Sequence, residues 1–108
     1  MNITTENEAL AELITTGKTT DRRYRKLPAS VINGFLKAYN ILRAVDRIED
    51  LYQHKGLNYE RLKGRLSQYE SVRCTVQYRL IFISRAMDDT LIIKDIELIE
   101  ISKHYGDN

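Results

Sequence analysis

The sequence of 108 residues has one cysteine, Cys74, and two histidines, which excludes an internal disulfide and leaves no Cys/His cluster that could hold zinc. No apolar run approaches the roughly 18–20 residues that a membrane-spanning helix needs. The first residues, MNITTENEALAEL, lack the basic start and the continuous apolar stretch of a signal peptide. We therefore expect a soluble protein of the cytoplasm that has no membrane attachment.

Common nucleotide-binding and hydrolytic motifs are missing as well. There is no phosphate-binding P-loop and no GxGxxG, HExxH or GxSxG pattern, so the sequence predicts neither a cofactor nor a metal site. Repeats and low-complexity linkers are absent too. The composition, 43% hydrophobic and 30% charged, is that of a folded chain. Its length suits a single domain over residues 1–108, with a core too small for a large cavity.

The net charge of +2 does not by itself indicate nucleic acid, but the charges are unevenly distributed. Residues 60–85 carry six basic side chains against two acidic ones, whereas residues 86–108 carry six acidic against two basic. Residues 17–26 hold a further basic group, made of Lys18, Arg22, Arg23, Arg25 and Lys26. This distribution predicts a polar molecule with one face that attracts anions; a set of solvated surface charges is the alternative.

The first half of the sequence has helical periodicity. Leu10, Leu13 and Ile14 predict a helix over 8–15 that stops at Gly17, after a short strand at the start of the chain. Apolar residues at three- and four-residue steps predict an amphipathic helix over about 28–44, with Pro28 in its first turn. A shorter apolar pattern follows over 45–52 and ends in a turn at 54–56.

After Gly64 the period changes from that of a helix to that of a strand. Alternation over 69–76, the β-rich run YRLIFIS over 78–84 and the segment 91–102 predict three strands joined by short links, the last of them bent or broken midway. Three such strands favour an antiparallel meander. The predicted fold class is therefore α+β, with a central antiparallel sheet packed on two or three N-terminal helices.

Arg73 and Arg79 are the first candidates for chemistry. They lie on two predicted strands joined by a turn at 75–77, which allows them to be cross-strand neighbours. Two adjacent guanidinium groups repel each other unless an anion or a carboxylate lies between them, and the guanidinium fork matches the oxygens of a phosphate. The alternative is structural, in that each arginine pairs with Glu60, Glu70 or an aspartate of the last strand.

Other polar residues are ambiguous when taken singly. Glu60 precedes LKG in a connecting segment within reach of the sheet, and alone it is an ordinary surface glutamate. His104 and Tyr105 end the last predicted strand, where surface positions are typical, and His54 falls in a polar turn.

Tyrosine is the dominant aromatic residue, and Tyr24, Tyr59, Tyr69 and Tyr78 lie among basic residues. That mixture suits stacking against single-stranded nucleic acid, although tyrosines that pack the core and keep the hydroxyl wet fit equally. Cys74 is predicted to face the core and to be unreactive.

Several segments together resemble the RelE/ParE superfamily of toxins from type II toxin–antitoxin systems, nearest its HigB-like "killer protein" branch. The segments that carry the resemblance are ITTGK (14–18), RRYRKLP (22–28), LNYERLKG (57–64), ESVRCTVQYRLIF (70–82) and IEISKHYGD (99–107). They cover nearly the whole chain. The resemblance implies a compact RelE-like fold and a metal-independent endoribonuclease that cuts mRNA in the ribosomal A site.

The resemblance also implies a set of catalytic residues. In the YoeB-like branch a glutamate precedes an LK pair, arginines lie on two central strands and a His-Tyr pair ends the chain, which here correspond to Glu60, Arg73, Arg79, His104 and Tyr105. HigB-like members often have histidine at the position of Glu60 and a terminal Asp-Tyr-His order. We expect Glu60 as general base, the arginines as charge stabilisers of the phosphorane, and His104 or Tyr105 as general acid.

The implied contacts extend beyond the pocket. Lys63 would hold the RNA backbone, and rRNA would be docked by Lys18, Arg22, Arg23, Arg25 and Lys26. Expected partners are mRNA and rRNA on the ribosome and a cognate antitoxin, a helix-turn-helix protein of the HigA-like kind whose complex with the toxin binds operator DNA.

Two other functions remain open on the same fold: a ParE-like toxin that poisons DNA gyrase, and an inactive nucleic-acid-binding module. Glu60, the arginine pair and the terminal His-Tyr favour the nuclease, because a gyrase poison has no need of them.

Overall fold

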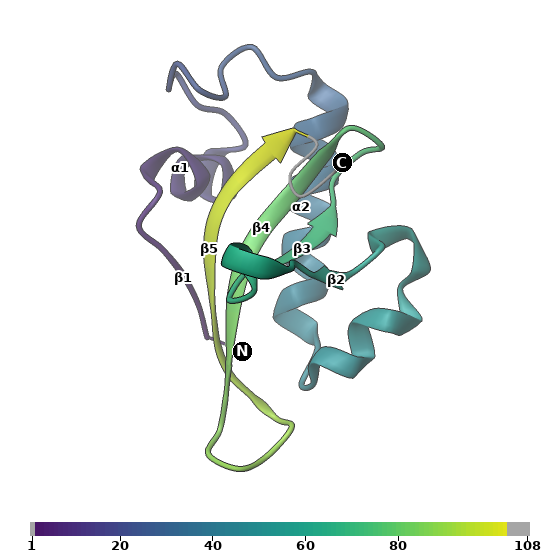
Figure 1. Ribbon diagram of the computed structural model, residues 1–108. Helices are drawn as coiled ribbons and strands as arrows, with labels where there is room; N and C mark the ends of the chain where they lie inside the picture. The colour runs from purple at the N-terminus through teal and green to yellow at the C-terminus, as the bar shows by residue number, and fades with distance from the viewer. Residues whose placement is uncertain (1, 104–108) are drawn as a thin grey trace.

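Five strands form one sheet in the computed structural model, which describes residues 2–103 (Figure 1). The order across the sheet is β1-β5-β4-β3-β2. The strands are β1 (Asn2–Thr5), β2 (Glu60–Arg61), β3 (Glu70–Arg73), β4 (Tyr78–Ala86) and β5 (Ile93–Lys103). The helices are α1 (Glu8–Thr16), α2 (Ala29–Ala44) and the short 3-10 helices η1 (Ile48–Gln53), η2 (Lys55–Leu57) and η3 (Gly64–Leu66). The predicted α+β class is confirmed.

The sheet is mixed, which corrects the prediction of an antiparallel one. Strands β2, β3, β4 and β5 pair antiparallel, as the short links between them require. β1 instead pairs parallel to β5, with Thr5 opposite Leu98. A parallel pair needs a long connection, and the helices and three intervening strands provide it.

The two faces of the sheet differ in polarity. α2 lies behind the sheet in Figure 1, and the core between them includes Phe35 and Leu42 from α2 with Val72, Leu80 and Phe82 from the strands, all fully buried. Because side chains alternate along a strand, Ser71, Arg73 and Arg79 belong to the opposite face. η3 lies in front of that face in Figure 1. No helix within 2–103 is long and apolar enough to cross a membrane.

The helix boundaries are set by residues at their ends, of which the sequence predicts Gly17 and Pro28 but not Asn7. The side chain of Asn7 accepts hydrogen bonds from the backbone N–H groups of Ala9 and Leu10, and Gly17 ends α1 in the left-handed region with φ of 78°. Pro28 immediately precedes α2. Gly34 is needed inside α2 because a Cβ atom there would overlap the carbonyl oxygen of Cys74, so only glycine lets the helix backbone approach the end of β3.

β3 is shorter than the predicted strand 69–76. The backbone N–H groups of Cys74 and Thr75 both donate to the carbonyl oxygen of Tyr78, at 2.8 and 3.1 Å, so the turn into β4 begins directly after Arg73. The bend expected in the last strand is present as a register shift, since Ile81 pairs with Glu100 but Phe82 pairs with Leu98.

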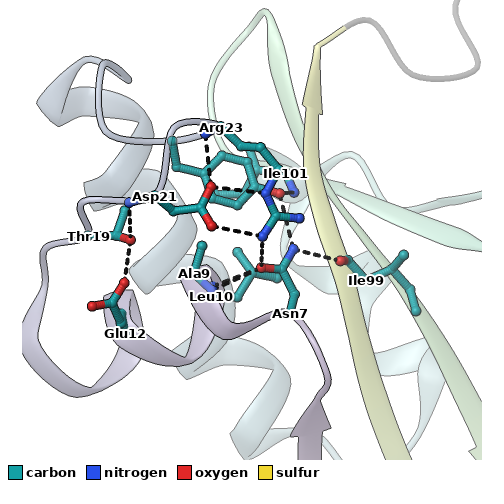
Figure 2. Close-up of polar contacts among 10 residues, drawn as sticks. Asn7, Ala9, Leu10, Glu12, Thr19, Asp21, Arg23, Ile99 and Ile101 are labelled. Atoms are coloured by element: carbon teal, nitrogen blue, oxygen red, sulfur yellow. Dashed lines mark hydrogen bonds and ion pairs between the residues drawn. The ribbon is translucent and has the colours of Figure 1, made fainter.

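β1 pairs with β5 only as far as Leu98. Beyond that residue, side chains take the place of β1 and satisfy backbone groups of β5 (Figure 2). Asn7 Nδ2 donates to the carbonyl oxygen of Ile99 at 3.1 Å, and the Tyr24 hydroxyl accepts from the N–H of Ile101 at 3.1 Å. Tyr24 is only 5% exposed. It is therefore a structural residue and is not available to stack on a base.

Candidate functional site

Arg73 and Arg79 lie directly opposite each other on β3 and β4, as the sequence predicts. Directly opposed residues have Cβ atoms about 4.5–5.5 Å apart and share a face of the sheet. Both side chains are half-buried. The pair therefore concentrates positive charge at one point of the polar face.

The guanidinium of Arg79 is held by two neutral acceptors. Its Nε donates to Ser71 Oγ at 2.8 Å, and Nη2 donates to the carbonyl oxygen of Asn58, the residue after η2, at 2.6 Å. Burial lowers the pKa of Arg79, attraction to Glu60 raises it in part, and repulsion from Arg73 lowers it. The charges of Glu60 and Arg73 therefore act on the pKa of Arg79 in opposite directions.

Glu60 reaches this group through the short strand β2. It lies opposite Ser71, the residue that accepts the hydrogen bond from Arg79. Glu60 is exposed, and it shares the sheet face of Ser71, Arg73 and Arg79. Three of the five predicted catalytic residues thus converge. The other two, His104 and Tyr105, lie outside the described residues.

The structural alternative for the arginines is wrong within residues 2–103. No carboxylate of this part of the chain lies within 4.0 Å of the guanidinium nitrogens of Arg73 or Arg79. Glu70 contacts Arg61 instead, at 3.8 Å, and Asp95 and Glu97 of the last strand pair with Arg85. The predicted positive site therefore keeps its charge. The hydrogen-bond acceptors of Arg79 are a hydroxyl and a carbonyl group.

A buried carboxylate, which sequence reasoning did not single out, fastens the segment around Glu60. Glu70 is fully buried, and it accepts hydrogen bonds from the Tyr59 hydroxyl and from the backbone N–H of Ser84, both at 2.8 Å. Burial and the nearby Glu70 charge raise the pKa of Tyr59, so its hydroxyl keeps its proton. The sequence signal that could have found Glu70 is its place in the strand alternation. It lies two residues before Val72, a core residue, and therefore on the same buried face.

The basic segment 18–26 is only partly available to a partner. Lys18, Arg22, Arg25 and Lys26 are exposed. Arg23 pairs with Asp21 at 3.0 Å and donates to Asn7 Oδ1 at 3.3 Å, so it fastens the segment to the start of α1 (Figure 2). Lys63, just beyond β2, is also exposed.

Comparison with known proteins places this fold and these strands among bacterial toxins. A family model described as "RelE-like toxin of type II toxin-antitoxin system HigB" matches residues 14–98. The curated relative Toxin HigB-1 of Vibrio cholerae serotype O1 is 39% identical over 62 residues, which cover 57% of this chain and 65% of that protein. The match thus spans just under two thirds of the relative's length.

Two solved structures share the fold. A YoeB/ParE toxin from Agrobacterium tumefaciens has a TM-score of 0.54 and 15% identity, covering 97% of this chain and 100% of that one. The YoeB-YefM complex from Staphylococcus aureus has a TM-score of 0.53 and 20% identity, covering 97% and 98% respectively. The expected RelE-like fold is confirmed.

Proposed function

Since the chain belongs to the HigB-like family of RelE-like toxins of type II toxin–antitoxin systems, we propose that it is an endoribonuclease that cuts mRNA on the ribosome and so stops translation. The observation that carries the proposal is the group of Glu60, Arg73 and Arg79. A carboxylate and two arginines without carboxylate partners within residues 2–103 share one face of the sheet.

The chemistry follows from what cleavage by the 2′-hydroxyl requires. Glu60 removes the proton from the 2′-hydroxyl, whose oxygen attacks the adjacent phosphorus. Arg79 and Arg73 stabilise the charge that develops on the phosphorane oxygens, and removing one such donor typically costs about 2.7–4 kcal/mol of barrier. His104 or Tyr105 gives a proton to the departing 5′-oxygen. The products are a 2′,3′-cyclic phosphate and a 5′-hydroxyl end.

Binding to the ribosome is assigned to basic residues outside this group. Lys63 holds the RNA backbone near Glu60, and Lys18, Arg22, Arg25 and Lys26 dock on rRNA. Arg23 contributes less, because its charge is shared with Asp21. The double variant Arg22→Ala/Arg25→Ala should therefore bind the ribosome more weakly than wild type at low salt, and its affinity should fall less steeply than that of wild type as salt rises. An unchanged salt dependence would make these arginines solvated surface only.

The proposed partner is a cognate antitoxin, a HigA-like helix-turn-helix protein whose complex with this chain binds operator DNA. The polar face around Arg73 and Arg79 is the surface that such a protein would cover, and both act in the cytoplasm. Expression of this chain alone should stop growth, and co-expression of the antitoxin should restore it. A chain that is harmless in cells would contradict the toxin function.

The decisive assay is cleavage of mRNA on programmed ribosomes. Glu60→Gln and Arg79→Ala should each lower the rate by at least about 10²-fold. Arg43→Ala is the matched control and should keep the wild-type rate, because Arg43 is an exposed arginine in the last turn of α2 and is not part of the group of Glu60, Arg73 and Arg79. Arg79→Lys retains the charge but loses the fork, and should lie between them.

The wild-type product should carry a 2′,3′-cyclic phosphate, and cutting should continue in excess EDTA once the magnesium that holds the ribosome together is allowed for. If wild-type protein cuts no ribosome-bound mRNA and instead inhibits supercoiling by gyrase, the nuclease proposal fails.

A further inference from the structure

A second feature beside the catalytic group is a cavity between α2 and η2. Its volume is about 210 Å³, and it lies at the end of β3. β2 pairs with β3 only at Glu70 and Ser71, so Arg73 lies at an edge of the sheet and borders both the polar face and this cavity on the side of α2. Gly34 and Ile41 of α2 and Leu57 of η2 form apolar walls, and the polar lining is basic: Lys37, His54 and Arg73. No acidic residue of the described chain lines it. The lining of the cavity is therefore basic, and no acidic side chain of the described residues neutralises it.

Its shape is fixed by a close backbone approach. A side chain at Gly34 would overlap the carbonyl oxygen of Cys74, so the helix and the strand end are in direct contact there. Lys37 follows one turn later on the same face of α2. The position of the lysine relative to Arg73 is thus set by two packed elements.

Arg73 supplies a second, independent observation. Its Nε is covered from solvent and has no hydrogen-bond partner among residues 2–103. Covered donors are almost always satisfied in folded proteins, so an unsatisfied one shows that the protein around Arg73 does not supply a full set of acceptors. Arg79, its neighbour across the strands, has acceptors for both Nε and Nη2. The two arginines therefore differ: protein acceptors hold the guanidinium of Arg79, whereas Arg73 Nε has none among residues 2–103, and an anion in the cavity that Arg73 lines would be attracted by its charge.

The size of the cavity limits what it can hold. At about 30 Å³ per water in the liquid, 210 Å³ corresponds to roughly seven waters. Sites for drug-sized ligands are larger, about 300–1,000 Å³. A phosphate group fits this volume and carries the charge that the basic lining attracts.

We propose that the cavity binds a backbone phosphate of the RNA strand, next to the phosphate at Arg79, through Lys37, His54 and Arg73. Because Arg73 lines the cavity and lies opposite Arg79, consecutive phosphates of one strand would occupy the two places. The choice of RNA as the source of the phosphate rests on the proposed function. Inorganic phosphate or a free nucleotide has the same chemistry, and the experiment separates them.

The test is binding of a single-stranded RNA oligonucleotide in which every 2′-hydroxyl is methylated, so that it cannot be cut. Its affinity for the full chain is measured by fluorescence anisotropy over a range of salt concentrations. Lys37→Met should weaken binding about fivefold and lower the slope of log K against log salt by about 0.7, the value for one contact to a single strand. Lys55→Met, an exposed lysine next to His54 that does not line the cavity, is the matched control and should change neither.

His54→Gln keeps a donor of similar size, and its affinity should fall between wild type and Lys37→Met. Lys37 and His54 are exposed, so the variants should melt with wild type, and equal melting temperatures exclude a folding defect. The proposal is overturned if Lys37→Met has the slope of Lys55→Met, or if the wild type does not bind the oligonucleotide at low salt.

Inorganic phosphate alone, titrated against the same variants, separates the sources. A Lys37-dependent site for inorganic phosphate with no effect of Lys37→Met on RNA binding would overturn the RNA assignment. Cleavage is scored separately: a Lys37-dependent salt slope in a chain that cuts no mRNA leaves this proposal standing and rejects the nuclease.

Discussion

Replacement of Glu70 tests how Glu60, the proposed catalytic carboxylate, is held in place. The buried Glu70 carboxylate accepts from the Tyr59 hydroxyl and from the N–H of Ser84, and it lies 3.8 Å from Arg61. Tyr59 and Arg61 are the two neighbours of Glu60 in the chain. One carboxylate on β3 therefore fixes the backbone on both sides of Glu60.

The magnitude follows from the donors that would lose their acceptor. Glu70→Ala removes the acceptor of the Tyr59 hydroxyl, the Ser84 N–H and the Ser84 hydroxyl, and at about 1–3 kcal/mol for each of these three groups the free energy of unfolding should fall by about 3–9 kcal/mol. Glu70→Gln keeps one oxygen for the Ser84 N–H and loses the charge, so it should cost about 1–3 kcal/mol. Glu97→Gln is the matched control, since its carboxylate pairs with the exposed Arg85, and should cost less than about 1 kcal/mol.

Urea denaturation of the three variants measures these differences, and cleavage on programmed ribosomes measures positioning. A shift of Glu60 by about 1 Å is enough to lower the rate about 10²-fold, so Glu70→Gln should lower kcat more than it changes KM. If Glu70→Gln is as stable as Glu97→Gln and cuts mRNA at the wild-type rate, the carboxylate neither holds β2 nor positions Glu60.

Other substitutions and one labelling experiment test the packing around the site. Tyr24→Phe leaves the buried N–H of Ile101 without an acceptor and should lower the free energy of unfolding by about 1–3 kcal/mol. Tyr52→Phe, at an exposed ring, is the control and should lower it by less than about 0.5 kcal/mol. Equal urea midpoints would show that water replaces the Tyr24 hydroxyl. Gly34→Ala should lower the melting temperature, because overpacking against the Cys74 carbonyl costs about 1–3 kcal/mol. This cost outweighs the gain of up to about 1 kcal/mol in helix propensity. A raised melting temperature would mean that α2 and β3 separate freely. Burial raises the pKa of Cys74 from 9.0 to about 12, so at pH 8 the folded chain has roughly 10³-fold less thiolate than the unfolded one and should be alkylated correspondingly slowly. Fast alkylation at pH 8 would contradict the burial. Because the folded state keeps the thiol proton to a higher pH than the unfolded state, the contribution of Cys74 to stability is lost as pH rises from about 9 to about 12.

Much of the fold could be predicted from periodicity, because one face of each long element is buried. The change of period after Gly64 located β3, β4 and β5, and the helical spacing located α1 and α2. β1 was expected as a strand but its parallel pairing was not, since four residues carry no pattern that selects a partner. β2 has only two residues, both exposed, and its existence depends on pairing with β3.

The candidate site shows the same limit at the level of side chains. Arg73 and Arg79 could be paired from the sequence because a tight turn sets the register of a hairpin. The role of Glu70 could not be predicted, because its partners Tyr59 and Ser84 are 11 and 14 positions away and come from two other segments. Tyr24 was ambiguous for the same reason: its partner, the backbone of Ile101, is 77 positions away.

Two arginines on β4 show how the chain keeps a positive site open. Arg85 lies near one end of the strand and is paired with Asp95 and Glu97 at 2.9 and 2.8 Å, so its charge is neutralised. Arg79 lies near the other end of the strand, on the same face, and is anchored by a hydroxyl and a carbonyl oxygen. Neutral acceptors fix the orientation of this guanidinium without pairing its charge with a carboxylate. Its burial and the nearby charge of Arg73 disfavour the charged form, and attraction to Glu60 opposes them only in part. The hydrogen bonds of Arg79 fasten β3 and the segment after η2 to β4, but they supply no anionic partner. A bound phosphate would supply one, so a polyanion gains most by binding at the point where the sheet leaves its arginines without carboxylates.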